Sequence, residues 1–415
     1  MKFYRFPENK ITAVLFAPFL LALLLLSRDT MLTTVIVSVE RAQFVTLGLM
    51  CLVGVAFLAV NRKSLKGIFT DRRLLLAVAV TVVFLVPMVI KKDWQLMYFS
   101  MLLCVYYSIF LSYFVSVKEL ARYFVVMMAA LGVYSVVANY LLRIPVDSGI
   151  WTVPSFTNSH GYLFHNFGLA IVPDTYVKIR NFGLFREPGV YQFFLLLALY
   201  LHNCVLSWKH NWQNWLINGI LAATMLTTFA TGGIIEMALF VAVLFLDRKL
   251  YQNKAVVAAV GILAAAAVAV GIYSLATRNA LYETLHNMLA KLFTAHGSTE
   301  VRLEAIWADL GIFLKHPVFG EKIATVMFSV DHNTTSSMLL YAIYGFVGGT
   351  VHVAAWVALV WQKERKLWVN LAMLVILFMS FNTQNLITDV FFWLFPMMAL
   401  AERGLPLMDK WSKTV

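Results

Sequence analysis

Arginine and histidine side chains gather in two polar stretches of an otherwise apolar chain. Arg180 and Arg186 stand in "RNFGLFREPG", directly before an apolar run, and Arg302 opens the helical pattern "VRLEAIWADLGIFLK". His332 and Asn333 follow in "DHNTTSS", again directly before an apolar run. Arginine offers a planar, permanently charged fork that fits phosphate oxygens, and histidine transfers protons near neutral pH. The combination predicts a site for an anionic, phosphorylated substrate.

Simpler interpretations exist for the same residues. Arg302 is also suited to reach lipid headgroups from a surface helix, and His332 is also suited to be a polar residue at a helix start. Glu187 either pairs with Arg186 or Arg180 and fixes the angle of the guanidinium, or stabilises the positive end of the following helix. We favour the pairing, because Pro188 at the helix start fixes the backbone at that point.

The composition places these residues in a membrane protein. Of 415 residues, 61% are hydrophobic and 13% are charged, and the mean hydropathy is +0.78, whereas soluble domains hold about a quarter charged residues. Apolar windows of about 17 to 25 residues are long enough to cross a hydrocarbon core of about 30 Å. Such windows recur near 11–27, 42–60, 74–90, 95–116, 122–142, 189–208, 212–230, 232–247, 255–275, 335–360, 368–382 and 385–402. We therefore expect an all-α polytopic membrane protein, one integral membrane domain over residues 1–415 with about twelve transmembrane helices.

The positions of the basic residues predict the orientation. With the N-terminus inside, twenty of the 33 Lys and Arg residues fall on cytoplasmic segments and four fall on short outer loops. Short cytoplasmic loops are enriched in Lys and Arg, whereas long translocated segments are exempt. Both termini are therefore expected in the cytoplasm. The net charge of +12 then reflects topology and contact with anionic lipids, with no nucleic acid as partner.

Two long segments, 143–188 and 276–334, are expected on the outer, periplasmic side, and connections of that length are usually functional. The second contains a predicted helix near 299–315 that would lie on the outer membrane surface. Its apolar residues recur at helical spacing: Leu303, Ile306, Leu310 and Phe313.

Several chemistries have no support in the sequence. Cys51, Cys104 and Cys204 all fall inside predicted spans and lack metal-ligand spacing. The chain also lacks a Gly-rich phosphate loop. We therefore expect neither a metal nor an organic cofactor, and a reaction carried out by outer loops and helix ends.

The two polar stretches match a family pattern. The element "RNFGLFREPGVYQF" resembles the arginine, glycine and Glu-Pro pattern that opens a span in bacterial polysaccharide polymerases. The stretch from "VRLEAIWADLGIFLKHPVFGEK" to "DHNTTSSMLLYAIYGFVGG" resembles the large-loop signature of the O-antigen ligase/polymerase superfamily. That signature is an arginine, a nearby tryptophan, a His-Pro-x-x-Gly turn, His-Asn and a Gly-rich span. The resemblance covers roughly residues 177–350.

This resemblance implies a membrane glycosyltransferase at the outer face of the bacterial inner membrane, acting on glycans linked to undecaprenyl pyrophosphate. Polymerases of the superfamily transfer the glycan to the sugar of another lipid-linked repeat, and ligases transfer it to a lipid A core. Carried over by position, Arg180 and Arg302 would hold the pyrophosphate, and His332 would orient or deprotonate the acceptor hydroxyl. The further substrate-binding candidates are Arg186, Glu187 and Asn333. The implied partners are the lipid-linked oligosaccharide, membrane lipids, a chain-length regulator and a flippase.

The chain departs from the family at one turn. Where members often have Ser-Arg-Gly, this chain has "ATGG", with Thr231, Gly232 and Gly233, and Glu236 follows inside a predicted span. An ionisable residue at such a place is a candidate functional group, although a pairing with water or a polar neighbour would also explain it.

Other functions are open at the level of sequence. The "FREPG" element favours a polymerase, whereas the His-Asn element is shared with ligases. A glycosyltransferase that uses polyprenyl-phosphate sugars would need an acid in the first outer loop, where Asp29 and Glu40 are the candidates. A flippase or other transporter would also have about twelve spans, but its polar residues would lie near the bilayer midplane.

Overall fold

The computed structural model describes residues 10–25, 27, 30, 32–33, 39–60, 71–157, 162–174, 179–206, 211–279, 281–283, 286, 298–330 and 333–403. The structure is mostly helical, at 75%. The α-helices are α1 (Lys10–Leu25), α2 (Val39–Val60), α3 (Arg72–Lys91), α4 (Leu96–Leu111), α5 (Val117–Val137), α6 (Arg143–Asp147), α7 (Pro188–Tyr200), α8 (Trp212–Thr227), α9 (Thr231–Asp247), α10 (Lys254–Thr277), α12 (Ser298–Lys315), α13 (Ile323–Met327), α14 (Ser337–Val360), α15 (Leu367–Phe381) and α16 (Val390–Arg403). Short π-helices η3 (Ala138–Leu142) and η4 (Leu201–Val205) and the 3-10 helix η5 (Leu250–Gln252) continue or join them.

A helix lies at each of the twelve predicted apolar windows. Among the described residues, four helical stretches are long and apolar enough to cross a membrane: α3, the continuous run of α5, η3 and α6, the run of α7 and η4, and α14. Shorter apolar helices include α4 and α15. Length and composition therefore support a membrane protein.

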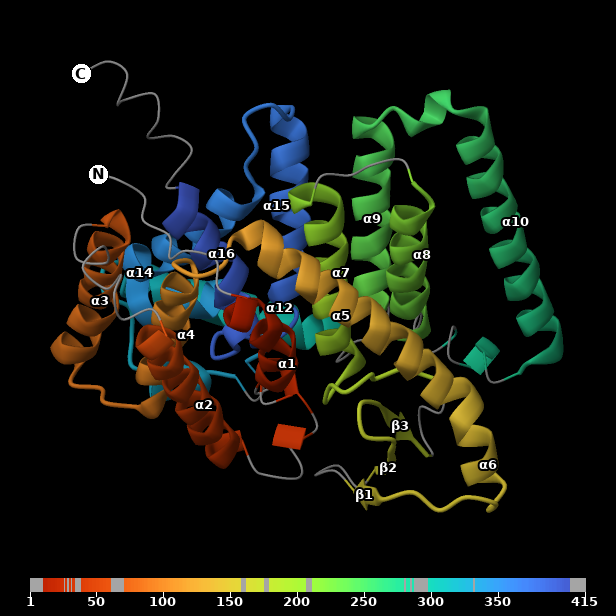
Figure 1. Cartoon of the computed structure of the whole chain (residues 1–415), viewed down its shortest axis with the longest axis horizontal. Coiled ribbons are helices and arrows are strands. Elements are labelled where there is room, and N and C mark those ends of the chain that lie inside the picture. The colour runs from red at the N-terminus through yellow and green to blue at the C-terminus, as the bar shows by residue number, and fades with distance from the viewer. Residues whose placement is uncertain are drawn as a thin grey trace.

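Helix α7 forms the centre of the bundle (Figure 1). Its residues are apolar on every side, and the whole stretch Pro188–Val205 is buried inside the protein. A helix that is hydrophobic all round is buried by its neighbours. Helices α8, α9 and α15 pack against it, and α9 also packs against α15. The N-terminal end of α7, where the "FREPG" element lies, is thus fixed by a rigid core.

The first long segment between apolar windows, 143–188, contains a small sheet that the all-α prediction omits. Strands β1 (Ser155–Thr157), β2 (Leu163–Asn166) and β3 (Ile171–Pro173) pair antiparallel in the order β1-β2-β3. Phe164 of β2 faces Phe156 of β1 and Pro173 of β3 across the register. With only three or four residues each, the strands are too short for an alternating pattern to reveal them. The correct description is a mostly helical fold with one three-stranded sheet.

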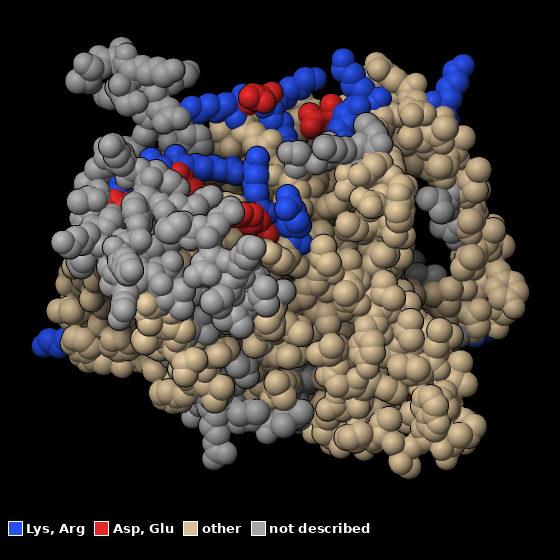
Figure 2. Space-filling view, viewed as in Figure 1, with Lys and Arg blue, Asp and Glu red and all other residues tan. Residues whose placement is uncertain are grey.

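The basic residues gather at the end of the bundle away from this sheet. In Figure 2, Lys and Arg lie along the edge that carries the α9–α10 and α14–α15 connections, whereas the end around the strands shows other residues in this view. These two connections hold Arg248, Lys249 and Lys254, and Lys363, Arg365 and Lys366. This polarity is what cytoplasmic enrichment of basic residues predicts.

Helix α14 is broken at Gly345, whose φ of 67° and ψ of −163° are not helical. The turn after α12 fills the break: the Phe346 N–H donates to Pro317 O (2.6 Å), and the Glu321 N–H donates to Ala342 O (2.8 Å). A broken helix is tolerated within an apolar bundle only where its freed backbone groups find partners. The His-Pro-x-x-Gly turn supplies these partners.

Candidate functional site

Arg180 is held at the C-terminal end of α8. Its Nε donates to Thr228 O (3.2 Å), directly after that helix ends. The next residue, Asn181, is 1% exposed and does most of the anchoring. Its amide donates to Ser135 Oγ (2.9 Å) and Thr227 Oγ1 (3.0 Å), which joins the segment to α5 and α8. The position of Arg180, the residue predicted to bind phosphate, is therefore fixed largely by the contacts of Asn181.

Gly183 permits the chain to turn back toward α7. Its φ is +57°, and a Cβ at this position would lie 2.6 Å from the ring of Tyr191. The Asn181 carboxamide oxygen accepts the Gly183 N–H (2.9 Å), which closes the turn. Glycine is required here both for the positive φ and for the close approach of the ring.

Glu187 pairs with arginine instead of capping its helix. It is the N-cap residue of α7, but its side chain makes no capping hydrogen bond. The Arg186 Nη1 atom lies 3.1 Å from Glu187 Oε1, and Gln384 Nε2 lies 3.5 Å from Oε2. Pro188 begins the helix, as predicted. Of the two interpretations of Glu187, the structure shows the pairing, and the partner in direct contact is Arg186.

Arg302 reaches the same place from α12. The face of α12 that packs inward carries Ala305 and Asp309, both fully buried, together with Arg302. Leu303, a residue of the predicted apolar stripe, is 51% exposed on the surface of the protein. Trp307 and Leu314 are also exposed, so the outward face of α12 is the apolar one. Helix α12 thus exposes several apolar residues and turns Ala305 and Asp309 toward the protein.

Arg180 and Arg302, far apart in sequence, are close enough for their charges to interact. Burial lowers the pKa of Arg180; the Glu187 carboxylate opposes this shift, and the Arg302 guanidinium adds to it. Burial also lowers the pKa of Arg302, and the carboxylates of Glu187 and Glu236 oppose that shift. Arginine keeps its charge under these conditions. The two half-buried arginines therefore lie near enough for their charges to interact, with Glu187 near both of them and Glu236 near Arg302.

Glu236 is the member of this site that the sequence left without a role. It lies in the second turn of α9 and is 1% exposed. The Ser380 hydroxyl of α15 and the Arg302 guanidinium are its polar neighbours. Within the described part of the chain, neither its Oε2 atom nor the Ser380 Oγ makes a hydrogen bond of ordinary geometry. Glu236 is thus a buried acid whose charge interacts with that of the half-buried Arg302.

Two glutamines complete the polar surroundings and were not singled out from the sequence. Gln192 of α7 accepts the Gly233 N–H (2.8 Å), and a Cβ at Gly233 would lie 2.1 Å from Gln192 Oε1. Gln384, in the turn after α15, covers Gly189, where a Cβ would lie 2.5 Å from its Nε2. The signal for Gln192 is its occurrence as a polar amide in the second turn of an apolar span. The first three residues of α9, Thr231-Gly232-Gly233, therefore leave room for the Gln192 side chain and hydrogen-bond to it.

Asn333 is held by a residue of α12. Its Nδ2 donates to Asp309 Oδ1 (2.8 Å), and its Oδ1 accepts the Thr335 N–H (3.1 Å). The Thr335 hydroxyl also donates to Asp309. Both ends of the Asn333 amide are thus engaged, which joins α12 to the start of α14. His332 and Asp331, directly before Asn333, lie outside the described residues.

We expect Asp309→Asn to stabilise the protein above pH 6 and to leave it unchanged near pH 4. Burial raises the pKa of Asp309 from 3.8 to about 6, so the folded state holds this proton more tightly than the unfolded state. The stability that the wild type loses as pH rises through this range is retained by the asparagine variant, a gain of order 1 kcal/mol at pH 8. Thermal unfolding of the purified protein at pH 4 and pH 8 measures the difference.

The matched control is Asp309→Leu. It removes the acceptor of both Asn333 and Thr335, so it should destabilise the protein at both pH values. An asparagine variant that is less stable than the wild type at pH 8 would contradict the assignment of Asp309 as a buried acid that costs stability when ionised.

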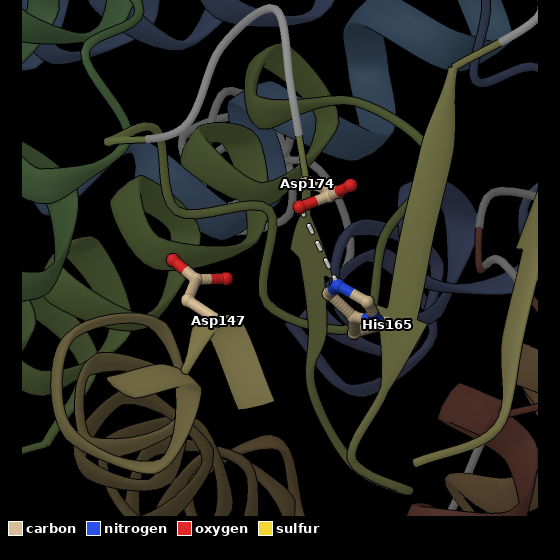
Figure 3. A group of neighbouring side chains, drawn as sticks. All are labelled: Asp147, His165 and Asp174. Carbon is tan, nitrogen blue, oxygen red and sulfur yellow. Dashed lines mark ion pairs between the residues drawn. The ribbon is translucent and has the colours of Figure 1, made fainter. Parts of the chain in front are cut away.

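A group of potential metal ligands lies apart from the arginines, beside the sheet (Figure 3). Ligand atoms of Asp147 at the end of α6, His165 of β2 and Asp174 after β3 all lie within 4.8 Å of one another. His165 Nε2 is 3.6 Å from Asp174 Oδ1, and Arg143 Nε is 2.8 Å from Asp147 Oδ2. Because Arg143 already supplies a positive charge, the group serves as an ion-pair network that ties α6 to the sheet.

Comparisons with known proteins add no family assignment. No protein-family model matches the chain, and a search of curated proteins gives no match.

Proposed function

We propose that this chain is a membrane glycosyltransferase that polymerises a bacterial surface polysaccharide. In this proposal it transfers an undecaprenyl-pyrophosphate-linked glycan to the sugar of another lipid-linked repeat at the periplasmic face of the inner membrane. The observation that carries the proposal is that Arg180 and Arg302, far apart in sequence and both half-buried, lie near enough for their charges to interact.

The location of the site agrees with such a reaction. Arg180 lies beside the C-terminal end of α8, and Arg302 lies near the start of α12. In Figure 1, that end of α8 is the one away from the α9–α10 connection. In the proposed topology, twelve helices cross the membrane with both termini in the cytoplasm, so this end is periplasmic. The exposed apolar face of α12 would then lie in the lipid, where a polyprenyl chain is also found.

The charges suit a pyrophosphate leaving group. Transfer breaks the bond between the sugar carbon and the pyrophosphate oxygen, and negative charge grows on that oxygen. Each buried guanidinium is able to form two parallel hydrogen bonds to phosphate oxygens, and such contacts are stronger in a site shielded from water. The proposal assigns this role to Arg180 and Arg302. His332 stays the predicted group that receives or orients the acceptor hydroxyl.

The roles of the nearby residues follow from their contacts. Arg186, whose side chain is 30% exposed, pairs with Glu187 at the rim and is proposed to guide the anionic substrate inward. Asn333 is proposed to fix the segment that carries His332, because Asp309 and Thr335 hold its amide. Membrane lipids, a flippase and a chain-length regulator are the proposed partners in the envelope.

Mass analysis of lipid-linked glycans in a strain lacking this chain tests the function. A polymerase predicts that single repeats accumulate on the lipid carrier and that longer chains disappear. A ligase predicts that polymer remains and accumulates on the carrier instead of on a lipid A core. A flippase also predicts single repeats, but these would stay on the cytoplasmic side and resist a periplasmic glycosidase. Unchanged lipid-linked glycans would contradict all three.

A further inference from the structure

The ion-pair network beside the sheet contains more negative than positive charge. Asp147 and Asp174 carry two negative charges, and Arg143, whose Nε donates to Asp147 Oδ2 (2.8 Å), balances one of them. In its neutral form the His165 imidazole adds no charge, and its Nε2 atom lies 3.6 Å from Asp174 Oδ1. These four side chains together therefore keep one negative charge, which favours a cation between them.

The three potential ligands offer the donors of a zinc site. Zn²⁺ is bound by imidazole nitrogen and carboxylate oxygen, often with three protein ligands and a water molecule. The ligand atoms of Asp147, His165 and Asp174 all lie within 4.8 Å of one another (Figure 3). Zinc bonds of about 2.0 to 2.2 Å place two donors of a tetrahedral site about 3.4 Å apart. The 3.6 Å between His165 Nε2 and Asp174 Oδ1 is close to this separation.

The backbone and Arg143 hold these ligands in place without an ion. His165 lies in the middle strand β2, which is paired on both sides. The Asp174 N–H donates to Leu163 O (2.9 Å) at the other end of that strand. Arg143 Nη2 donates to the backbone oxygen of Asp174 (3.3 Å), while its Nε holds the Asp147 carboxylate. Outer contacts of this kind orient the ligands of metal sites.

The sheet is small enough to gain from a metal ion. Its strands have three or four residues each, and the buried cluster beside it consists of Phe164, Ile171 and Phe182. Units with so small a core are commonly stabilised by a metal ion or a disulfide. The Ile171 N–H donates to Gly183 O (2.6 Å), so the sheet in turn supports the segment that carries Arg180.

We propose that Asp147, His165 and Asp174 bind a Zn²⁺ ion that joins α6 to the sheet. The side chains of the three ligands are 35%, 15% and 28% exposed, so the ion reaches them from solvent. Arg143 keeps its place as the residue that holds both aspartates. The inference does not rest on the proposed function, because it concerns α6 and the sheet and not the chemistry of the arginines.

The test titrates ZnCl2, CaCl2 and MgCl2 into the detergent-purified full chain by isothermal titration calorimetry. Any polyhistidine tag is removed beforehand, and bound metal is stripped with EDTA. The wild type should bind Zn²⁺ more tightly than Ca²⁺ or Mg²⁺, because imidazole suits Zn²⁺ and the harder cations prefer oxygen ligands alone. Asp174→Asn and His165→Gln, which nearly keep the shapes of the side chains, should each lower the Zn²⁺ affinity about a hundredfold or more.

The matched control is His316→Gln, which changes a histidine outside the sheet. His316 Nε2 lies 3.1 Å from Glu321 Oε2, and its side chain is 48% exposed. This variant should keep the Zn²⁺ affinity of the wild type. Equal affinity in the wild type, Asp174→Asn and His165→Gln would mean adventitious binding elsewhere and would overturn the inference. Tighter binding of Ca²⁺ or Mg²⁺, or no binding of Zn²⁺ by the wild type, would also overturn it.

Proteolysis of the wild type keeps the test decisive if a variant does not fold. Zn²⁺ at saturating concentration should slow cleavage within residues 143–188, and EDTA should restore the original rate. Size-exclusion chromatography shows whether each variant is folded. Cleavage at the same rate with and without Zn²⁺ would overturn the inference and leave the proposed glycan transfer untouched.

Discussion

Replacement of Arg302 by alanine is expected to abolish polymer formation while the protein remains in the membrane at its normal level. The charge of Arg302 interacts with those of Glu187, Glu236 and Arg180, so its loss removes one of the two half-buried positive charges that we propose for the leaving pyrophosphate. The loss of one such contact in a dry site typically costs a factor of about a hundred or more in rate. Chain-length ladders from a strain that expresses the variant measure the effect.

Lysine at the same position should restore activity only in part. An ammonium supplies the charge but not two parallel hydrogen bonds to phosphate. The matched control is Arg122→Ala, which removes an exposed arginine near the N-terminal end of α5. It should give the wild-type ladder. A wild-type ladder from Arg302→Ala would remove Arg302 from the site.

Replacement of Gly345 by alanine is expected to give the largest loss of stability. Its φ of +67° is strained for any residue with a Cβ, and that Cβ would lie 2.3 Å from Val318 O. The obstacle is backbone, so no side-chain rotation relieves it. Backbone strain at position 345 and displacement of the 316–320 turn from α14 should together lower the free energy of unfolding by at least about 3 kcal/mol. We expect little monodisperse protein in fluorescence-detected size-exclusion chromatography.

The control for this prediction is a glycine in open surroundings. A Cβ at Gly271 in α10 meets nothing within 4 Å, so Gly271→Ala should be neutral or mildly stabilising, by up to about 1 kcal/mol. Gly320, which packs its positive-φ backbone against Ile343 from the other side, should behave like Gly345. If Gly345→Ala has the yield and thermal stability of the wild type, glycine is not required at this break in α14, and the prediction is wrong.

The lengths of the apolar windows predicted the positions of the helices well, because these windows depend on local composition alone. Every predicted apolar window carries a helix, and the predicted surface helix near 299–315 is α12, Ser298–Lys315. The same reasoning missed the three-stranded sheet, whose strands are held by pairing between segments and not by their own pattern. The apolar spacing in α12 predicted an amphipathic helix, but it did not predict that Asp309 would be buried in the face that packs inward.

The candidate site was accessible to sequence reasoning only one element at a time. Residue type and position near helix ends identified Arg180 and Arg302, but not that their charges would interact. Glu236 was recognised as an unusual acid, whereas its position beside Arg302 depends on how α9 and α12 pack. The bond between Asp309 and Asn333 likewise joins two helices. Tertiary packing alone determines such pairs.

The central claim is that one purified chain transfers a pyrophosphate-linked glycan through the Arg180 and Arg302 site. The most direct measurement mixes the detergent-purified protein with a lipid-linked repeat unit, with neither a second compartment nor a nucleotide, and resolves the products by mass. The account predicts glycans of two or more repeats on one lipid and release of polyprenyl pyrophosphate, both lost in Arg180→Ala and Arg302→Ala. Unchanged substrate with folded wild-type protein, or equal turnover by both variants, would contradict it.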